Sequence, residues 1–314
     1  MRNISRPVLI LGYNRPNKIK FLIKKLLKLK IKKIYISLDG PKNNFHDISK
    51  NNEIKKYLTK FKNRKSIKLN LFSKNLGCKK AVKIGIDWFF SYESAGIILE
   101  DDCLPTEEFF KYCDVMLDKF KNNNKIYAIS GNNFINSKHL TNHSGNFYYS
   151  IYPNFWGWAT WAKSWSTYDI NLKKWKNKKY KYKIKKKLNN FFGFFYWEYI
   201  FDLLIKNKID TWDYQCFFEV WSKDLFVIKP FTNLVFNSGM KSNYTHEHSS
   251  VFQKFSKTNK IKKNINWLYD YKNVKYDYNL DNIYENQILN YKFYFFKIIF
   301  YRVLRRIRKL SKRF

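Results

Sequence analysis

Three adjacent carboxylates, Glu100-Asp101-Asp102, are the residues whose types and spacing most clearly permit chemistry. They follow the apolar run Gly96-Ile97-Ile98-Leu99 and precede Pro105, so the pattern predicts a buried strand that ends at the triplet. Neighbouring carboxylates repel each other unless a cation or water compensates their charge. Hard oxygen ligands suit Mg²⁺ or Mn²⁺, which can bridge a diphosphate and stabilise the charge that develops as it leaves. The alternative is a solvated loop before a helix that begins with Glu107 and Glu108.

Strand and helix patterns alternate along the first 130 residues and determine where these carboxylates would lie. Apolar runs and apolar alternation predict five strands, at residues 7–13, 34–38, 67–71, 96–99 and 126–130. Helices are predicted from about Asn17, after Gly77 and near Thr106. This alternation is typical of an α/β fold with a mostly parallel central sheet flanked by helices. Ligands of such sheets bind at the carboxyl ends of the strands, here at Asn14-Arg15, Asp39 and the triplet.

Aromatic residues become frequent after about residue 145. Residues 148–165 are too irregular to predict as helix or strand, and the lysine-dense residues 171–187 are expected to form a solvated surface insertion or helix. Further helices are predicted at Trp197–Ile205 and near Asp213, and a strand at Phe226–Ile228. We therefore divide the chain into residues 1–145, 146–270 and 271–314.

The last of these segments ends in an apolar run, residues 293–301, that precedes a set of cationic residues: Arg302, Arg305, Arg306, Arg308, Lys309, Lys312 and Arg313. This order is typical of a helix that lies in the interface of an anionic membrane, and the run is too short to span one. The alternative is a terminal helix packed on the body with a basic outer face. The sequence shows neither an apolar stretch long enough to span a bilayer nor a signal-peptide pattern. We therefore expect a cytoplasmic protein, peripheral on the inner face of the cytoplasmic membrane.

The chain has 314 residues and a formal net charge of +37, and its 45% of hydrophobic residues excludes a mainly disordered protein. The lysine excess accompanies many Asn, Ile, Phe and Tyr residues, a set that A/T-rich coding also favours, so the charge is either compositional or an attraction for anionic lipid, nucleotide or acidic glycan. The four cysteines show no paired spacing and are expected to be free thiols. No nucleic-acid-binding module is recognisable, so no nucleic-acid partner is expected.

Several motifs together make the chain similar to a known family. The run Ile97–Pro105, with Phe109-Phe110 behind it, resembles the GT-A glycosyltransferases related to N-acetylglucosaminyltransferase I. The resemblance is closer to a bacterial group of sugar transferases described as glycosyltransferase family 2 or hemolysin-like. It extends over roughly residues 7–250 in collinear order, through stretches at Pro7–Pro16, Asn75–Ala81, Ser130–Phe134, Phe155–Trp161 and Thr211–Gln215.

The resemblance implies a GT-A fold and a nucleotide site. Residues 1–145 would form the nucleotide-sugar-binding half and residues 146–270 an aromatic-rich acceptor half. Asp102 matches the ligand of Mn²⁺ or Mg²⁺, and Glu100 and Asp101 would support it or contact the ribose. Arg15, with Asn14 beside it, matches a nucleotide contact, and Asp39 matches the carboxylate that pairs with uracil.

The resemblance also implies a general base and a closing loop. Asp213 matches the base of the inverting members, and His246 lies in the loop that closes over the nucleotide and touches phosphate or metal. That loop reads Lys-Ser-Asn-Tyr-Thr-His here and lacks the acidic residues that the bacterial group usually carries, which puts direct metal ligation by it in doubt.

Chemistry supports Asp213 independently. Inverting glycosyl transfer needs one base to take the acceptor hydroxyl proton, and it needs no protein nucleophile because a metal-bound diphosphate is already a good leaving group. Asp213 stands between Trp212 and Tyr214, whose rings could raise its pKa by desolvation. Its alternative role is a helix N-cap.

Three further residues are candidates with equally plain structural alternatives. Asn75 and Lys79 flank the predicted start of a helix, whose amides together with a lysine could bind a diphosphate. Surface exposure is the alternative for such a lysine in a lysine-rich chain. Trp158 could stack on a sugar, and core packing is its alternative.

These patterns predict an inverting, metal-dependent glycosyltransferase that moves a hexosyl or N-acetylhexosaminyl group from a UDP-sugar to a cell-surface glycan or lipid-linked acceptor. The competing hypotheses are a nucleotidyltransferase, for which the glycine-poor Gly12-Tyr13-Asn14-Arg15 is a weak match, and a basic nucleic-acid-binding protein.

Overall fold

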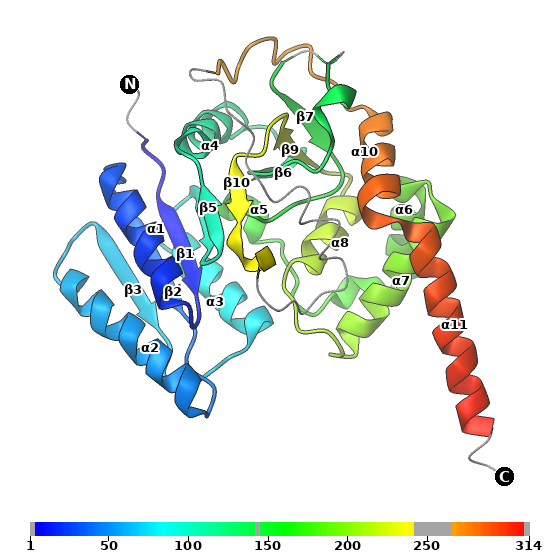
Figure 1. Cartoon of the computed structure of the whole chain (residues 1–314). Helices are drawn as coiled ribbons and strands as arrows, with labels where there is room; N and C mark the ends of the chain where they lie inside the picture. Colours follow the sequence, from blue (N-terminus) through cyan, green and yellow to red (C-terminus); the bar gives the residue numbers. More distant parts are fainter. Residues whose placement is uncertain (1–3, 142, 144, 242–264, 311–314) are drawn as a thin grey trace.

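Eight strands form the central sheet of the protein in the computed structural model, which describes residues 4–141, 143, 145–241 and 265–310. These strands are β1 (Val8–Gly12), β2 (Ile34–Leu38), β3 (Ile67–Leu71), β4 (Ala95–Glu100), β6 (Ile126–Ser130), β7 (Phe147–Ser150), β8 (Trp158–Trp161) and β9 (Phe226–Pro230). Their order is β3-β2-β1-β4-β8-β6-β9-β7 (Figure 1). Four of the seven pairings are parallel and three antiparallel. The predicted α/β architecture with a mostly parallel central sheet is confirmed.

Helices flank this sheet, as predicted, and the longer ones are α1 (Pro16–Lys28), α2 (Phe45–Leu58), α3 (Cys78–Phe90), α4 (Glu107–Lys119), α6 (Lys178–Leu188), α7 (Phe191–Ile205), α8 (Tyr214–Ser222), α10 (Tyr278–Tyr284) and α11 (Tyr291–Leu310). Shorter elements are α5 (Ala162–Trp165), the π turn η5 (Glu285–Leu289) and the 3-10 turns η1 (Thr59–Phe61), η2 (Ser137–His139), η3 (Lys173–Lys176) and η4 (Ser238–Lys241). A small second sheet pairs β5 (Cys103–Pro105) with β10 (Val235–Asn237).

Successive residues of β1 point to opposite faces of the sheet, which is why its sequence is continuously apolar. Val8 and Ile10 belong to one buried cluster, which α1 and α4 complete. Leu9 and Leu11 belong to a second cluster, which contains α3 and the aromatic helices α7 and α8. The register aligns the ends of neighbouring strands, because Gly12 lies opposite Leu38 and Leu11 opposite Glu100. The polar residues that follow these strands therefore meet at one sheet edge.

Helix α2 and strand β8 are two of the elements that were not expected from the sequence. Helix α2 buries Asp47, Asn51, Ile54 and Leu58, so only half of its buried face is apolar and the helical pattern is weak. Strand β8 lies in the segment too irregular to predict. It is antiparallel to both β4 and β6 and fully buried, so its Trp-Ala-Thr-Trp sequence shows no alternation between apolar and polar residues.

The last described segment is part of the core up to its final helix. Leu280, Tyr284, Ile288 and Tyr291 are buried in the same aromatic cluster as α7 and α8. The boundary set at residue 271 therefore does not mark the edge of the core. Helix α11 then extends away from the body (Figure 1). None of the described helices combines the length and the hydrophobicity needed to cross a bilayer.

Candidate active site

A pocket of about 700 Å³ opens where β1, β2 and β4 end. Its described lining contains six carboxylates: Asp39, Glu100, Asp101, Asp102, Asp210 and Asp213. Arg15 and Lys42 are the Lys and Arg side chains in that described lining. The pocket is thus acidic in a protein whose formal net charge is +37. An anionic ligand would be repelled there unless a cation accompanied it.

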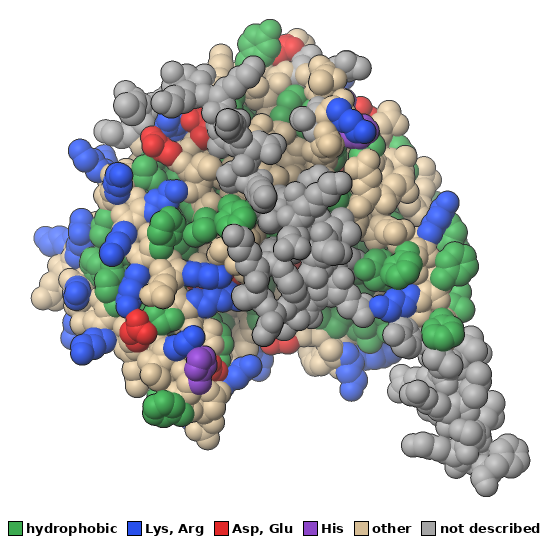
Figure 2. All heavy atoms as spheres, viewed as in Figure 1, with side chains coloured by type: hydrophobic (Ala, Val, Ile, Leu, Met, Phe, Trp, Pro, Cys, Tyr) green, Lys and Arg blue, Asp and Glu red, His purple; other side chains and the backbone are tan. Residues whose placement is uncertain are grey.

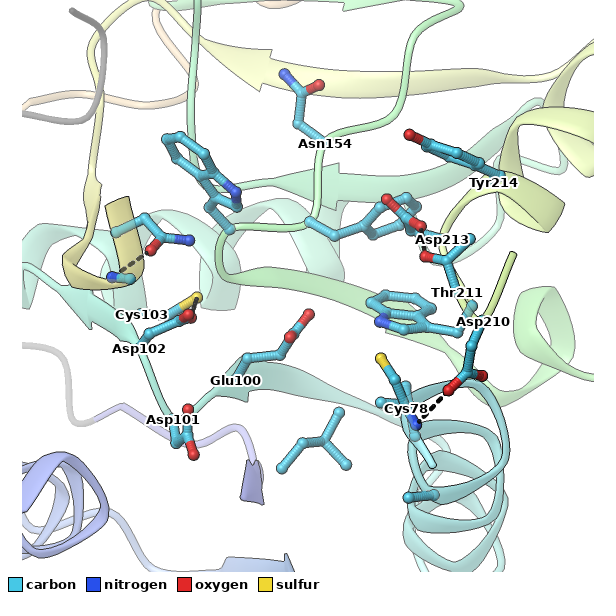
Figure 3. A pocket seen from close by; sticks show the side chains of 18 of the residues that line it. Cys78, Glu100, Asp101, Asp102, Cys103, Asn154, Asp210, Thr211, Asp213 and Tyr214 are labelled. Carbon is cyan, nitrogen blue, oxygen red and sulfur yellow. Dashed lines mark hydrogen bonds between the residues drawn. The ribbon is translucent and has the colours of Figure 1, made fainter. Parts of the chain in front are cut away.

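The triplet turns sharply after β4, so its three side chains occupy different positions (Figure 3). Asp101 is buried, and its carboxylate accepts hydrogen bonds from the Tyr13 backbone N–H at 3.3 Å and from Arg15 Nη1 at 2.6 Å. Asp102 is more accessible, and its Oδ2 lies 3.1 Å from the same Arg15 nitrogen. Burial alone would lower the pKa of Arg15, but Asp101 and Asp102 outweigh it and raise that pKa. Arg15 therefore neutralises part of the triplet.

Glu100 lies between Asp102 and Asp213 and points into the pocket (Figure 3). Burial, followed by the negative charges of Asp102 and Asp213, raises the pKa of Glu100 to about 8. Burial and the neighbouring carboxylates thus favour the protonated form of Glu100, and a cation nearby would oppose them.

Asp39, at the end of β2, organises the loop before α3. It is 6% exposed, and its Oδ1 accepts hydrogen bonds from the backbone N–H groups of Gly40 and Leu76. Its Oδ2 accepts one from Asn75 Nδ2 at 2.9 Å. Burial raises the pKa of Asp39, and these backbone hydrogen bonds oppose the rise. Asp39 and Asn75 thus line the pocket together, as the sequence predicted, but they also bind each other.

The N-terminus of α3 binds a carboxylate of the protein itself. The prediction that its backbone amides bind a diphosphate is therefore wrong. Asp210 accepts hydrogen bonds from the backbone N–H groups of Cys78 at 3.2 Å and Lys79 at 3.1 Å. A negative charge is stabilised at this end of a helix, so Asp210 satisfies the site. Lys79 does not line the pocket, since its ammonium is held 3.4 Å from Asn207 Oδ1 and the residue is buried.

Asp213 lines the pocket on the side opposite the triplet (Figure 3). It occupies the N-cap position of α8, but its side chain makes no cap hydrogen bond. The carboxylate instead accepts a hydrogen bond from the Thr211 hydroxyl, two residues earlier. The Tyr168 hydroxyl donates to the Trp212 carbonyl at 2.9 Å, which fixes the backbone of this segment. The N-cap alternative is therefore wrong, and the carboxylate is oriented within the pocket.

Aromatic residues form the other part of the lining, among them Phe134, Trp156, Tyr196, Trp197, Trp212, Tyr214 and Tyr284. Trp158 is not among them. It is 1% exposed on β8, with its ring stacked 5.6 Å from that of Trp212. Trp158 is thus a core residue because β8 is central in the sheet, and its predicted contact with a ligand is not supported.

Asn14 and His246 were also predicted as site residues, and only Asn14 lies in the described part of the chain. Asn14 is absent from the lining, and its Nδ2 donates to Asp47 Oδ1 at 2.7 Å. It shares this carboxylate with the Tyr13 hydroxyl and so supports the loop after β1. His246 lies outside the described residues. Within the described part of the chain, no three His, Cys, Asp or Glu side chains are grouped closely enough to hold a metal ion.

Several pocket residues escaped the sequence reasoning because tertiary contacts bring them in. Asn237 ends β10, which pairs with β5 beside the triplet, so its place depends on a partner 134 residues away. Gly239 lies two residues after Asn237, and a Cβ there would lie 2.4 Å from Asp102 Oδ2. The only sequence signal was an Asn and a Gly after the short apolar run Leu234–Phe236. The 3-10 turn η4 thus packs directly on the Asp102 carboxylate.

Comparisons with known proteins give little further information. No family model matches the chain, and no curated protein matches it. One similar solved structure is that of HddC from Yersinia pseudotuberculosis, with a TM-score of 0.30 and 14% sequence identity. The similarity covers 51% of this chain and 78% of that one. At this TM-score the likeness supports no conclusion about function.

Proposed function

We propose that the protein is a metal-dependent, inverting glycosyltransferase of GT-A type that uses a UDP-sugar. The observation that carries this proposal is the acidic pocket at the carboxyl ends of parallel strands, whose described lining combines six carboxylates with several aromatic rings. Nucleotide ligands of α/β sheets bind at this edge. A diphosphate can enter such a pocket only together with a cation, and aromatic faces suit the C–H faces of sugars.

The candidate ligand of a divalent cation is Asp102, which is partly accessible. The described acidic side chains form no ready-made three-ligand cluster, so the substrate phosphates and water would have to complete the coordination, as is usual for Mg²⁺. Mn²⁺ or Mg²⁺ held by Asp102 would supply charge stabilisation for the departing diphosphate. Arg15, which already pairs with Asp101 and Asp102, would turn its exposed guanidinium edge to the nucleotide phosphates.

Asp213 is the residue that would accept the proton of the acceptor hydroxyl. It lies across the pocket from Asp102, as a base must when donor and acceptor meet between them (Figure 3). The Thr211 hydroxyl donates to this carboxylate and orients it within the pocket. The acidity of the pocket also disfavours nucleic acid there, because phosphate backbones bind to basic surfaces.

Turnover of a panel of UDP-sugars, followed as UDP release, tests this function. We expect release in Mn²⁺ or Mg²⁺ and none in a chelator. Asp213→Asn should lower kcat by about 10²–10⁴-fold with little change in the donor KM, because only proton transfer is lost. Asp118→Asn, at an exposed carboxylate outside the pocket, is the matched control. Full activity in the chelator would reject the metal role, and wild-type turnover of Asp213→Asn would reject the base.

A further inference from the structure

Exposed aromatic side chains line one side of α11. Phe293, Phe296 and Phe300 are 56%, 64% and 61% exposed, and their spacing places them on one side of the helix. The opposite side carries Tyr291 and Ile298, which are buried against the body. Helix α11 therefore has two apolar faces, and the body covers one of them.

The exposed face continues onto α7. Phe191, the first residue of α7, is 64% exposed, and its ring lies 5.8 Å from that of Phe295 on α11. Phe295 also packs on Phe192 at 5.1 Å and on Phe195 at 4.8 Å. Edge-to-face packing of this kind fixes the two helices against each other. The apolar surface is thus built by two helices.

A lysine-rich helix packs next to this apolar surface. Helix α6 ends three residues before Phe191 and carries seven lysines and no acidic residue: Lys178, Lys179, Lys181, Lys183, Lys185, Lys186 and Lys187. It packs on α7, where Lys181 Nζ lies 3.1 Å from Glu198 Oε1. The sequence of α11 beyond Phe300 adds Arg302, Arg305, Arg306, Arg308 and Lys309. Hydrophobic side chains beside basic ones are visible along the described part of α11 in Figure 2.

We propose that α6, the N-terminal end of α7 and α11 together form a docking surface for an anionic lipid bilayer. The phenylalanines would enter the acyl boundary, and the lysines would lie at the level of the headgroups. Helix α7 also supplies Tyr196 and Trp197 to the pocket lining. Docking therefore brings the aromatic side of the pocket close to the membrane. This last point rests on the proposed function, and it indicates a lipid-linked acceptor.

Cosedimentation of the full chain with vesicles tests the surface, using phosphatidylcholine alone and mixed with phosphatidylglycerol. We expect binding to the anionic vesicles at least about tenfold tighter than to the neutral ones. The combined phenylalanine variant carries Phe191→Ser, Phe293→Ser and Phe296→Ser. Its affinity for the anionic vesicles should be at least about tenfold weaker than that of the wild type. Phe45→Ser, at a residue 88% exposed on α2, is the matched control and should bind as the wild type does.

The same assay distinguishes the contribution of α7 from that of α11, and the contribution of charge from that of the phenylalanines. Phe191→Ser alone should weaken binding, and a wild-type affinity would overturn the composite surface in favour of α11 by itself. A triple variant of α6, Lys179→Gln with Lys183→Gln and Lys186→Gln, tests the charge. It should weaken binding to anionic vesicles more than the control triple variant at the end of α2 and at η1, Lys56→Gln with Lys60→Gln and Lys62→Gln. Equal binding to neutral vesicles would overturn the proposal. The proposal would also be overturned if the wild type formed a dimer without lipid and the combined phenylalanine variant were monomeric, because the surface would then be a dimer interface.

The outcome for docking is separate from the outcome for catalysis. UDP-sugar hydrolysis requires no membrane, so the combined phenylalanine variant should retain the wild-type rate. If the wild type binds vesicles but releases no UDP, the proposed function fails and the docking surface stands. If the wild type releases UDP but binds no anionic vesicle, the docking surface is rejected and the proposed function stands.

Discussion

Glu100 is the side chain whose protonation is most sensitive to what else occupies the pocket. Burial and the carboxylates of Asp102 and Asp213 raise its pKa to about 8. Arg15 opposes this rise, but it is engaged with Asp101 and Asp102. The pKa of Glu100 therefore depends directly on the net charge of the pocket. Six carboxylates in one pocket repel one another and destabilise the folded state unless their charge is compensated, and this free-energy cost should be measurable at Glu100.

Glu100→Gln should stabilise the protein at high pH in a chelator. An acid whose pKa rises on folding, here from 4.5 to about 8, binds its proton more tightly when folded. The folded wild type therefore loses stability as the pH rises through this window, whereas glutamine has no proton to lose. We expect a stability gain of about 2 kcal/mol near about pH 9 that vanishes near about pH 5, reduced from the full shift because water screens a partly exposed site.

Urea unfolding at several pH values measures this difference. Glu107→Gln, at an exposed carboxylate of α4, is the control and should follow the wild-type pH dependence. Parallel pH curves for Glu100→Gln and the wild type would show that Glu100 titrates normally.

Helix α3 and the segment before α8 hold the two sides of the pocket together. Asp210 binds the N-terminus of α3, and Asp213, three residues later, faces the substrate side. One short segment thus links the N-terminus of α3 to the carboxylate that we propose as the base. The sequence predicted α3 and its start at Gly77, but not the carboxylate from 132 residues away that occupies its amides. Periodicity predicts elements and says nothing about which distant side chain caps them.

Asp210→Ala should therefore impair both stability and turnover. Losing the charge and hydrogen bonds at a helix N-terminus costs about 1 kcal/mol in the free energy of unfolding. The turnover number kcat should also fall, because the segment that carries Asp213 is no longer held to α3 by Asp210. Asn177→Ala removes the side-chain cap of α6, far from the pocket, and should cost similar stability without lowering kcat. Equal kcat values for both variants would show that Asp210 is only a helix cap.

The molecule as a whole combines an acidic pocket with a strongly basic surface. The first 130 residues could be predicted closely, with β2, β3 and β6 at their expected bounds, because buried parallel strands are continuous or alternating apolar runs. The second half could not, since β8 is buried on both faces and shows no period. The same division holds for the site: strand-end residues such as Asp102 were found, whereas Asn237 and Asp210 depend on long-range contacts.

Calorimetric titration of UDP into the protein tests the central claim most directly, namely that the acidic pocket binds a nucleoside diphosphate through a divalent cation at Asp102. We predict UDP binding to the wild type in Mn²⁺ and loss of at least about tenfold in affinity when the ion is chelated. Asp102→Asn should show the weakened affinity even with Mn²⁺ present, while Asp118→Asn binds as the wild type does. UDP binding of equal strength with and without the ion, or undiminished in Asp102→Asn, would contradict the account.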